Sequence, residues 1–101
     1  MATFGIVHRF PGGTREQYEK VVEVVHPDGG ESLPEGELLH LAGSTPDGWL
    51  VMSVHESRES WERFRDDTFM PGLDSVDDGL PGPPEETAFE VEVFRTQHRT
   101  A

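Results

Sequence analysis

Apolar and polar residues alternate along three stretches of the chain, which is the periodicity of β-strands. The stretches are residues 3–10, 37–55 and 87–94. In the second, Thr45-Pro46-Asp47-Gly48 separates two apolar runs. Proline presets φ, aspartate bonds its own backbone and glycine accepts a positive φ, so this stretch predicts a hairpin. The chain therefore has four expected strands.

The expected hairpin has two chemically different faces. We assume that Gly48 takes the left-handed position after a type I turn. The cross-strand pairs are then Ser44 with Trp49, Ala42 with Val51, His40 with Ser53, and Leu38 with His55. The opposite face carries only apolar side chains: Leu39, Leu41, Leu50, Met52 and Val54. We expect helices to cover the apolar face, and the mixed face to stay uncovered and hold the functional site.

Two segments between the expected strands have helical spacing. Thr14-Arg15-Glu16-Gln17 forms a capping box, and an apolar stripe follows it, which predicts a helix from Arg15 to Val25. Ser57 is the expected cap of a second helix, which Met70-Pro71-Gly72 should end. The inner stripe of the second helix is formed by Trp61, Phe64 and either Thr68 or Phe69.

This order of elements predicts an α+β fold, a ferredoxin-like βαββαβ sandwich with both helices on one sheet face. Residues 1–95 form the single expected domain and residues 96–101 a polar C-terminal tail. We expect the first and third strands to be central, adjacent and parallel. His8 and His55 then lie near the same end of neighbouring strands and His40 lies one pair away, so three imidazoles converge within roughly 10 Å.

Two further segments leave alternatives open. Residues 71–86 are rich in glycine, proline and acidic residues, and form either an ordered flap over the uncovered sheet face or a disordered excursion. In the last strand, Glu90 and Glu92 are interpreted as outward charges that discourage edge pairing. If their face is the inner one, a glutamate beside His8 would raise the pKa of that histidine and supply a base.

The net charge is −12, from 20 acidic and 8 basic residues. A negative field of this size repels phosphate backbones and anionic lipids, which argues against nucleic-acid and membrane partners. The absence of cysteine excludes disulfides, thiolate metal sites and cysteine nucleophiles. With no signal peptide and no apolar run of membrane-spanning length, we expect a cytoplasmic protein. Only 34% of the residues are hydrophobic, and a small chain of this kind often completes its core by dimerising.

Four segments of the chain carry a resemblance to a known family. They are Phe4-Gly5-Ile6-Val7-His8, Asp47-Gly48-Trp49-Leu50-Val51-Met52-Ser53-Val54, Glu56-Ser57-Arg58-Glu59-Ser60-Trp61-Glu62-Arg63-Phe64 and Leu80-Pro81-Gly82-Pro83-Pro84-Glu85. With them the chain resembles the dimeric α+β barrel superfamily, and within it the small antibiotic-biosynthesis-monooxygenase-like domains of actinobacterial type. The resemblance implies a homodimer whose two sheets face each other to form a barrel, with a ligand cavity between each sheet and its helices or flap.

Relatives of such domains include cofactor-independent oxygenases of polyketide quinone pathways, haem-degrading enzymes, isomerases and cyclases. The haem-degrading branch relies on an Asn, Trp and His constellation, onto which Trp49 and the histidines cannot be mapped residue by residue. Nucleotide, flavin, nicotinamide and haem motifs are missing as well, so we expect no cofactor.

His8, His40 and His55 are the candidate catalytic residues. As acid–base groups they have a pKa near neutrality, which suits proton transfer inside a cavity. They could instead be ordinary hydrogen-bonded histidines at a sheet or dimer interface. They could also be three ligands of a metal ion, but histidines on separate strands are a weak metal signal, so no metal site is assigned.

The remaining candidates are weaker. Ser53 beside His40 suggests a nucleophile with its base, although a structural hydroxyl is the favoured interpretation. Trp49 is either a wall on which a ligand stacks or a plug in the dimer interface. His26 and His98, at a helix end and in the tail, are not candidates.

We therefore expect a dimeric protein that binds a small aromatic or polyketide-like molecule. Its proposed activity is proton abstraction by a histidine, followed by cofactor-independent oxygenation or rearrangement. The expected substrate-binding residues are Phe4, Ile6, Trp49, Val51 and Ser53. The alternatives are a non-catalytic interaction or ligand-sensing dimer and a metal-dependent enzyme that uses the same histidines.

Overall fold

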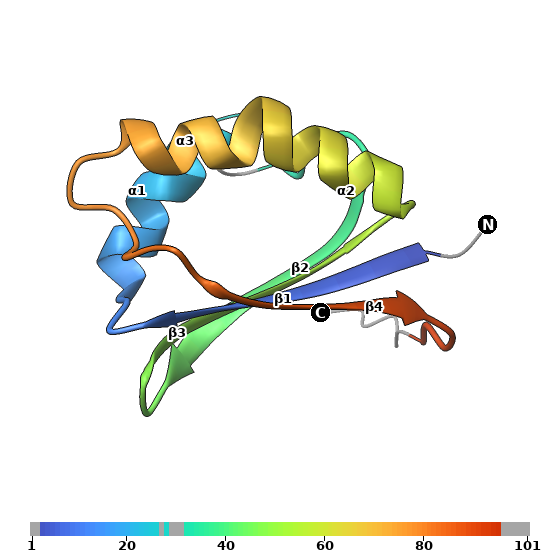
Figure 1. Ribbon diagram of the computed structural model, residues 1–101, viewed down its shortest axis with the longest axis horizontal. Coiled ribbons are helices and arrows are strands. Elements are labelled where there is room, and N and C mark those ends of the chain that lie inside the picture. Colours follow the sequence, from blue (N-terminus) through green and yellow to red (C-terminus); the bar gives the residue numbers. More distant parts are fainter. Residues whose placement is uncertain (1–2, 27, 29–31, 96–101) are drawn as a thin grey trace, which may run out of the picture.

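A four-stranded antiparallel sheet carries the described helices on one face (Figure 1). The computed structural model describes residues 3–26, 28 and 32–95. The strands are β1 (Thr3–Pro11), β2 (Glu37–Thr45), β3 (Gly48–His55) and β4 (Glu85–Val91), in the spatial order β2-β3-β1-β4. The helices are α1 (Arg15–Val25), α2 (Arg58–Phe64) and α3 (Met70–Ser75), and the π-helical segment η2 (Arg65–Phe69) joins the last two. This arrangement confirms the predicted ferredoxin-like α+β fold.

The expectation that the two central strands are parallel is wrong, because β1 and β3 pair antiparallel. Helix α1 returns the chain so that β2 runs in the direction of β1, and the tight hairpin then reverses it for β3. As a result, His55 faces Phe4 and His8 faces Val51. The two histidines thus lie at different positions along the sheet and not at one end of it.

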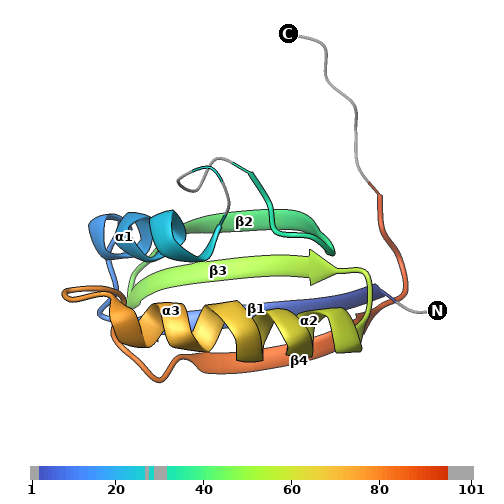
Figure 2. The ribbon, with the colours of Figure 1, turned by 90° about the horizontal axis from the view of Figure 1, so that it is seen from above.

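Local signals place both helix starts where the sequence predicts them. The Thr14 side chain accepts from the Gln17 backbone and the Gln17 side chain accepts from the Thr14 backbone, which completes the capping box of α1. The Ser57 hydroxyl likewise accepts from the Ser60 backbone N–H and begins α2. Figure 2 shows α1 on the β2 side of the helical layer and α2 to α3 on the β1 and β4 side.

The second helix does not end at Met70-Pro71-Gly72, as the sequence suggested. It widens into η2, where the Met70 N–H donates to the Arg65 carbonyl, and continues through α3. Pro71 falls in the first turn of α3, where a missing N–H costs little. Gly72 has no Cβ, which lets α3 lie directly against Val25 of α1. The helix therefore extends five residues further than Met70, to Ser75.

The two sheet faces are reversed relative to the sequence expectation. The mixed face, with the histidines, lies under the helices, and the apolar face is the one that no described helix covers (Figure 1). The reason lies in β1, whose inner residues Phe4 and Ile6 form the core with Trp61 of α2. Cross-strand pairing then places every second residue of β3 on that same side.

The hairpin register agrees with the prediction except at its open end. The pairs Ser44 with Trp49, Ala42 with Val51 and His40 with Ser53 are confirmed. The fourth pair is wrong, because the register shifts between Glu37 and Leu39 and places Glu37 opposite His55. A β-bulge of this kind puts two residues of one strand against one of the other and redirects a side chain.

The irregular segment before the last strand is shorter than the expected residues 71–86, and it lies elsewhere than over the uncovered face. After α3, residues 76–84 form an irregular connection whose Leu80 reaches the space between sheet and helices. It therefore closes one end of the helix-covered side and is not a flap over the uncovered face. Strand β4 begins at Glu85, and the predicted tail 96–101 lies outside the described residues.

Candidate functional site

The bulge in β2 positions a buried carboxylate under the helices. In a regular strand, residues 37 and 40 would point to opposite faces, because side chains alternate. The extra residue of the bulge puts both Glu37 and His40 on the helix-covered face. The Glu37 side chain is only 2% exposed. Sequence periodicity could not indicate Glu37, since the alternation there is broken.

Glu37 lies between two imidazoles. Its Oε2 is 3.0 Å from Nδ1 of His40, and its Oε1 is 3.6 Å from Nε2 of His26. The rings of His26 and His40 meet edge to face, with 4.8 Å between their centroids. Tyr18 of α1 completes the chain of contacts, because its hydroxyl is 2.5 Å from Nε2 of His40. Four side chains, two from α1 and its C-cap and two from β2, therefore form one polar cluster under the helices, the Glu37 cluster.

His26 belongs to this cluster although the sequence analysis set it aside. It caps the end of α1, and its backbone N–H donates to the Val22 carbonyl. Val21 and Val25 define the buried side of α1, and the chain leaves the helix on that side. The stripe of valines leading up to His26 was the signal that could have indicated its burial.

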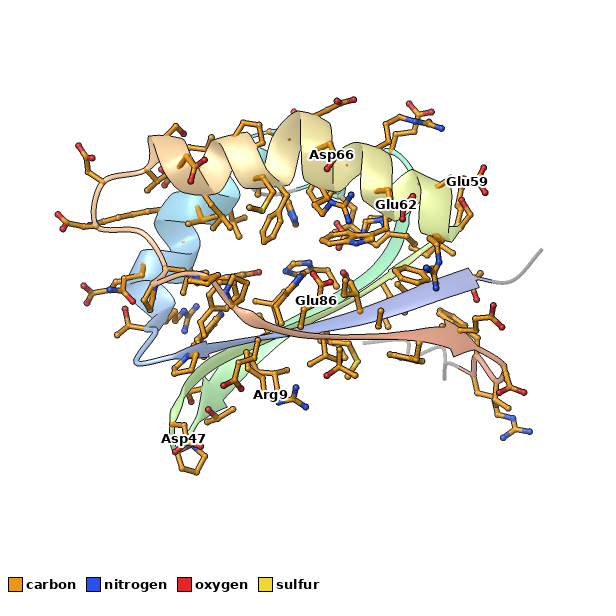
Figure 3. The ribbon with its side chains drawn as sticks, viewed as in Figure 1. Arg9, Asp47, Glu59, Glu62, Asp66 and Glu86 are labelled. Atoms are coloured by element: carbon orange, nitrogen blue, oxygen red, sulfur yellow. The ribbon has the colours of Figure 1, made fainter. Side chains whose placement is uncertain are left out.

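A second histidine–carboxylate pair lies on the same face of the sheet, on the neighbouring strands β1 and β4. Nε2 of His8 is 3.0 Å from Oε2 of Glu86, the residue directly opposite it on β4. His8 is 3% exposed and packs against Trp61 and Phe69, with ring centroids 5.3 Å away in each case. Figure 3 shows Glu86 on the helix side of the sheet, whereas Arg9 points away from it.

The carboxylate beside His8 is therefore Glu86, and neither of the two glutamates that the sequence analysis considered. Glu90 shares the inward register of β4 but lies opposite Phe4, and it is exposed. Glu92 lies beyond the end of β4 and is also exposed. The favoured interpretation, in which Glu90 faces outward, is therefore wrong for its register, and the alternative of an inward glutamate beside His8 applies at Glu86 instead of Glu90 or Glu92.

His55 and Ser53 lie deeper than expected. His55 is fully buried between Trp61 and Phe64, and the Ser53 hydroxyl is 3.4 Å from its Nε2. Nδ1 of His55 is buried and has no hydrogen-bond partner in the described part of the chain. The hydroxyl is thus next to His55, although Ser53 is the cross-strand partner of His40. Ser53 and His40 therefore do not form the nucleophile–base pair that was the less favoured alternative, since both ring nitrogens of His40 have other partners.

Trp49 is neither at the uncovered face nor at the cavity wall. Its ring lies 5.2 Å from that of Tyr18, between the sheet and α1. The side chain is buried, and none of the described residues forms a hydrogen bond with its Nε1. The register of β3 places Trp49 on the helix-covered side, so its side chain is not part of the uncovered face.

A small cavity separates the Glu37 cluster from the His8–Glu86 pair. It has about 40 Å³ of free space. Its polar wall is formed by His8, Tyr18, His26, Glu37, His40 and Ser53. The rest of the wall is aromatic and aliphatic, with Leu80 of the connection before β4 at one side.

The predicted site residues divide into two groups around this cavity. His8, His40, Val51 and Ser53 are at its wall. Phe4 and Ile6 lie in the core with Trp61, behind the wall, and His55 is not at the wall either. Among the described residues, His8, His40 and His55 do not come close enough to bind one ion together, which removes the three-histidine metal alternative.

Burial determines the protonation of these groups. It lowers the pKa of His8, an effect that Glu86 partly opposes. Burial also lowers the pKa of His26 and of His55, and Glu37 acts against it in both cases. For Tyr18, burial raises the pKa, and the charges of Glu37 and Glu19 add to this. At neutral pH His8 and His26 are therefore neutral imidazoles at the cavity wall, and Tyr18 is a protonated phenol.

Comparison with known proteins supports the fold. No family model matches the chain, and no curated protein does. Among solved structures, a crystal structure described as "putative Antibiotic biosynthesis monooxygenase" from Chloroflexus aurantiacus J-10-fl has a TM-score of 0.64 with 15% sequence identity, over 94% of this chain and 98% of that one. Within the described residues, no helix is long and apolar enough to cross a membrane. The chain thus has the ferredoxin-like α+β fold of that protein, while the narrower likeness to actinobacterial domains stays a prediction.

Proposed function

We propose that the protein binds a small aromatic or polyketide-like molecule in the cavity between its sheet and helices, and removes a proton from it with His8. The observation that supports this most directly is the His8–Glu86 pair. A buried imidazole at the wall of a largely apolar cavity is held at 3.0 Å by a carboxylate from the neighbouring strand. The chain also has a fold similar to that of a protein described as a "putative Antibiotic biosynthesis monooxygenase", which agrees with an oxygenation reaction.

The geometry gives each member of the pair a role. The Glu86 carboxylate accepts the Nε2 proton of His8, which fixes the tautomer and leaves the lone pair on Nδ1. Because burial lowers the pKa of His8, the ring is neutral at neutral pH and can accept a proton. Glu86 then stabilises the imidazolium that forms. Of the other two candidate bases, His40 has both ring nitrogens engaged and His55 is away from the cavity wall.

For a phenolic substrate the proposed reaction needs no cofactor. His8 takes the hydroxyl proton, and the electron-rich ring transfers one electron to O₂. The two radicals combine, and the proton returns to give a hydroperoxide on the ring carbon. Loss of the hydrogen on that carbon with cleavage of the O–O bond releases water and leaves a quinone. One oxygen atom enters the product, the other leaves as water, and the substrate supplies all the electrons.

The cavity must enlarge to hold such a substrate. Its roughly 40 Å³ accommodates a few water molecules, whereas pockets for small ligands measure several hundred Å³. Two wall residues come from segments without regular α-helix or strand structure: Phe69 at the end of η2 and Leu80 in the connection before β4. π-helical turns are frequent at functional sites. We propose that these two side chains move to admit the substrate.

The proposed functional unit is a homodimer in the cytoplasm. The face of the sheet away from the helices is apolar and includes Leu41, which is 53% exposed, and Phe89, which is 42% exposed. Exposed apolar surface of this kind is typical of an interaction surface. A second copy packing on it would give the two-sheet barrel that the sequence resemblance implies.

The test is oxygen uptake and product analysis with a panel of polycyclic phenols. We expect turnover by the wild type and a loss of about 10²-fold or more in kcat for His8→Gln, the usual contribution of a general base. Glu86→Gln should reduce kcat less, and Glu90→Gln is the matched control, since it removes an inward-register glutamate of the same strand away from His8. Tight ligand binding without oxygen uptake would contradict the proposed chemistry and favour a non-catalytic ligand-binding protein.

A further inference from the structure

We propose that His26, Glu37 and His40 bind a divalent transition-metal ion of the Zn²⁺ class. One ligand atom from each of the three residues lies within 4.8 Å of the other two. Two imidazoles and one carboxylate are a donor set that suits Zn²⁺ and its neighbours in the first transition series. This site goes beyond the proposed function and does not depend on it, because none of its ligands belongs to the His8–Glu86 pair.

The spacing of the ligands fits a common ion. Bonds of about 2.0–2.2 Å in a tetrahedral arrangement hold ligand atoms roughly 3.4 Å apart. Nε2 of His26 is 3.6 Å from Oε1 of Glu37, and Nδ1 of His40 is 3.0 Å from Oε2. Small rotations of these side chains would therefore bring Nε2 of His26, Nδ1 of His40 and one carboxylate oxygen of Glu37 to bonding distance from a single ion, without a change in the backbone.

An unpaired atom points to the same conclusion independently. Oε1 of Glu37 is buried, its side chain being only 2% exposed, and it has no hydrogen-bond partner among the residues that the structure describes. A buried carboxylate oxygen without a partner is costly, and burial without compensation is rare. A cation between His26 and Glu37 would compensate it. Hydrogen bonding within the cluster does not, because Oε2 alone engages His40.

The surroundings supply what a metal site needs beyond its ligands. Metal-bound histidines usually donate their other ring N–H to an acceptor, which fixes the ring. In His40 that second nitrogen is Nε2, 2.5 Å from the Tyr18 hydroxyl. Coordination through Nδ1 would move the ring proton to Nε2, where the Tyr18 oxygen can accept it. The adjoining cavity, of about 40 Å³, has room for a water molecule as fourth ligand.

The experiment measures metal binding directly. Protein freed of metal with a chelator is titrated with Zn²⁺ and with Co²⁺, whose visible absorption reports a tetrahedral site. We expect one ion per chain and a rise in Tm with Zn²⁺. Glu37→Gln and His26→Gln should weaken binding at least tenfold and abolish the rise. Tyr18→Phe should weaken it by about 10- to 100-fold, as loss of an outer hydrogen bond to a ligand does.

The controls separate this site from the other histidine–carboxylate pair. His8→Gln and Glu86→Gln should bind metal like the wild type, whatever they do to turnover. In the wild type, ring ¹⁵N resonances of His26 and His40 should shift on addition of Zn²⁺ while those of His8 do not, a measurement that does not depend on any variant folding. The proposal is wrong if the folded wild type does not bind either ion, or if binding is unchanged in Glu37→Gln.

Discussion

Glu37 of β2 is the cross-strand partner of His55 of β3, a position that Leu38 would occupy if the alternation were uninterrupted. The bulge thereby brings a carboxylate into the same buried layer as His26, His40 and His55. Without it, an apolar residue would face the helices and the imidazoles would have no common acceptor. The polar cluster under the helices is therefore a consequence of one additional residue in the strand.

The metal-free protein should depend on Glu37 for stability. Glu37→Leu removes the acceptor of His40 Nδ1 and leaves two buried imidazoles without it. We expect a loss of about 1–3 kcal/mol in the free energy of unfolding, measured by urea denaturation with a chelator present. The control is Glu35→Leu, because Glu35 is exposed and lies two residues before Glu37. We expect this substitution to change the free energy of unfolding by no more than about 0.5 kcal/mol. Equal stability of the two variants would contradict a structural role for the cluster.

His8 should make stability sensitive to acid. Burial lowers its pKa in the folded state, so below about 6.5 the unfolded chain takes up a proton that the folded chain resists. The free energy of unfolding therefore falls as pH decreases from about 6.5 toward the folded pKa. The charged group that acts on His8 is Glu86 from β4, whose hydrogen bond and charge partly oppose the effect of burial on the pKa.

Two substitutions should change this pH dependence in opposite directions. His8→Gln should flatten the decrease, because it removes the titrating group. Glu86→Gln should deepen it, because it removes the interactions that raise the pKa of His8. The measurement is urea denaturation at a series of pH values on either side of 6.5, with each variant compared with the wild type. A decrease that is the same in all three proteins would assign the effect to other groups.

The parts of the fold that could be predicted from the sequence have local causes. The capping box of α1, the Ser57 cap of α2, the hairpin turn and three of its four pairs are set by neighbouring residues. The direction of β3 relative to β1 and the choice of covered face depend on how distant segments pack. Phe4, Ile6 and Trp61 decide which face is buried, and none of them is in the hairpin.

The site was predicted only in part for the same reason. His8 and His40 were identified, because imidazoles at regular strand positions are visible in the sequence. Glu86 was missed because it falls in a stretch that reads as a loop rich in proline and glycine, and its position is fixed only by pairing with β1. Glu37 was missed because the bulge interrupts the alternation of β2. His26 was missed because the valine stripe of α1 indicates that its end is buried, but not that His26 meets a carboxylate there.

The cavity should become larger when the Phe69 side chain is removed from its wall. Phe69 packs against His8 and Trp61 and is only partly buried. Phe69→Ala should therefore cost less than the roughly 3–5 kcal/mol of a fully buried phenylalanine, while enlarging the cavity beside His8. We expect Phe69→Ala to bind a bicyclic phenol with a lower Kd or a higher association rate than the wild type, measured by quenching of tryptophan fluorescence. The control is Phe94→Ala, an exposed phenylalanine beyond β4, which should leave binding unchanged.

The uncovered face of the sheet should hold two copies of the chain together. Leu41 lies on this face and Val24 on α1, and both side chains are 53% exposed, so substitutions at the two positions change a similar amount of surface. Light scattering after size-exclusion chromatography should give a dimer for the wild type. Leu41→Lys should shift it to the monomer, because a charge would be buried against an apolar partner surface. The control Val24→Lys should remain a dimer. If the wild type is a monomer at micromolar concentration, the prediction is wrong and the apolar face does not hold two copies of the chain together.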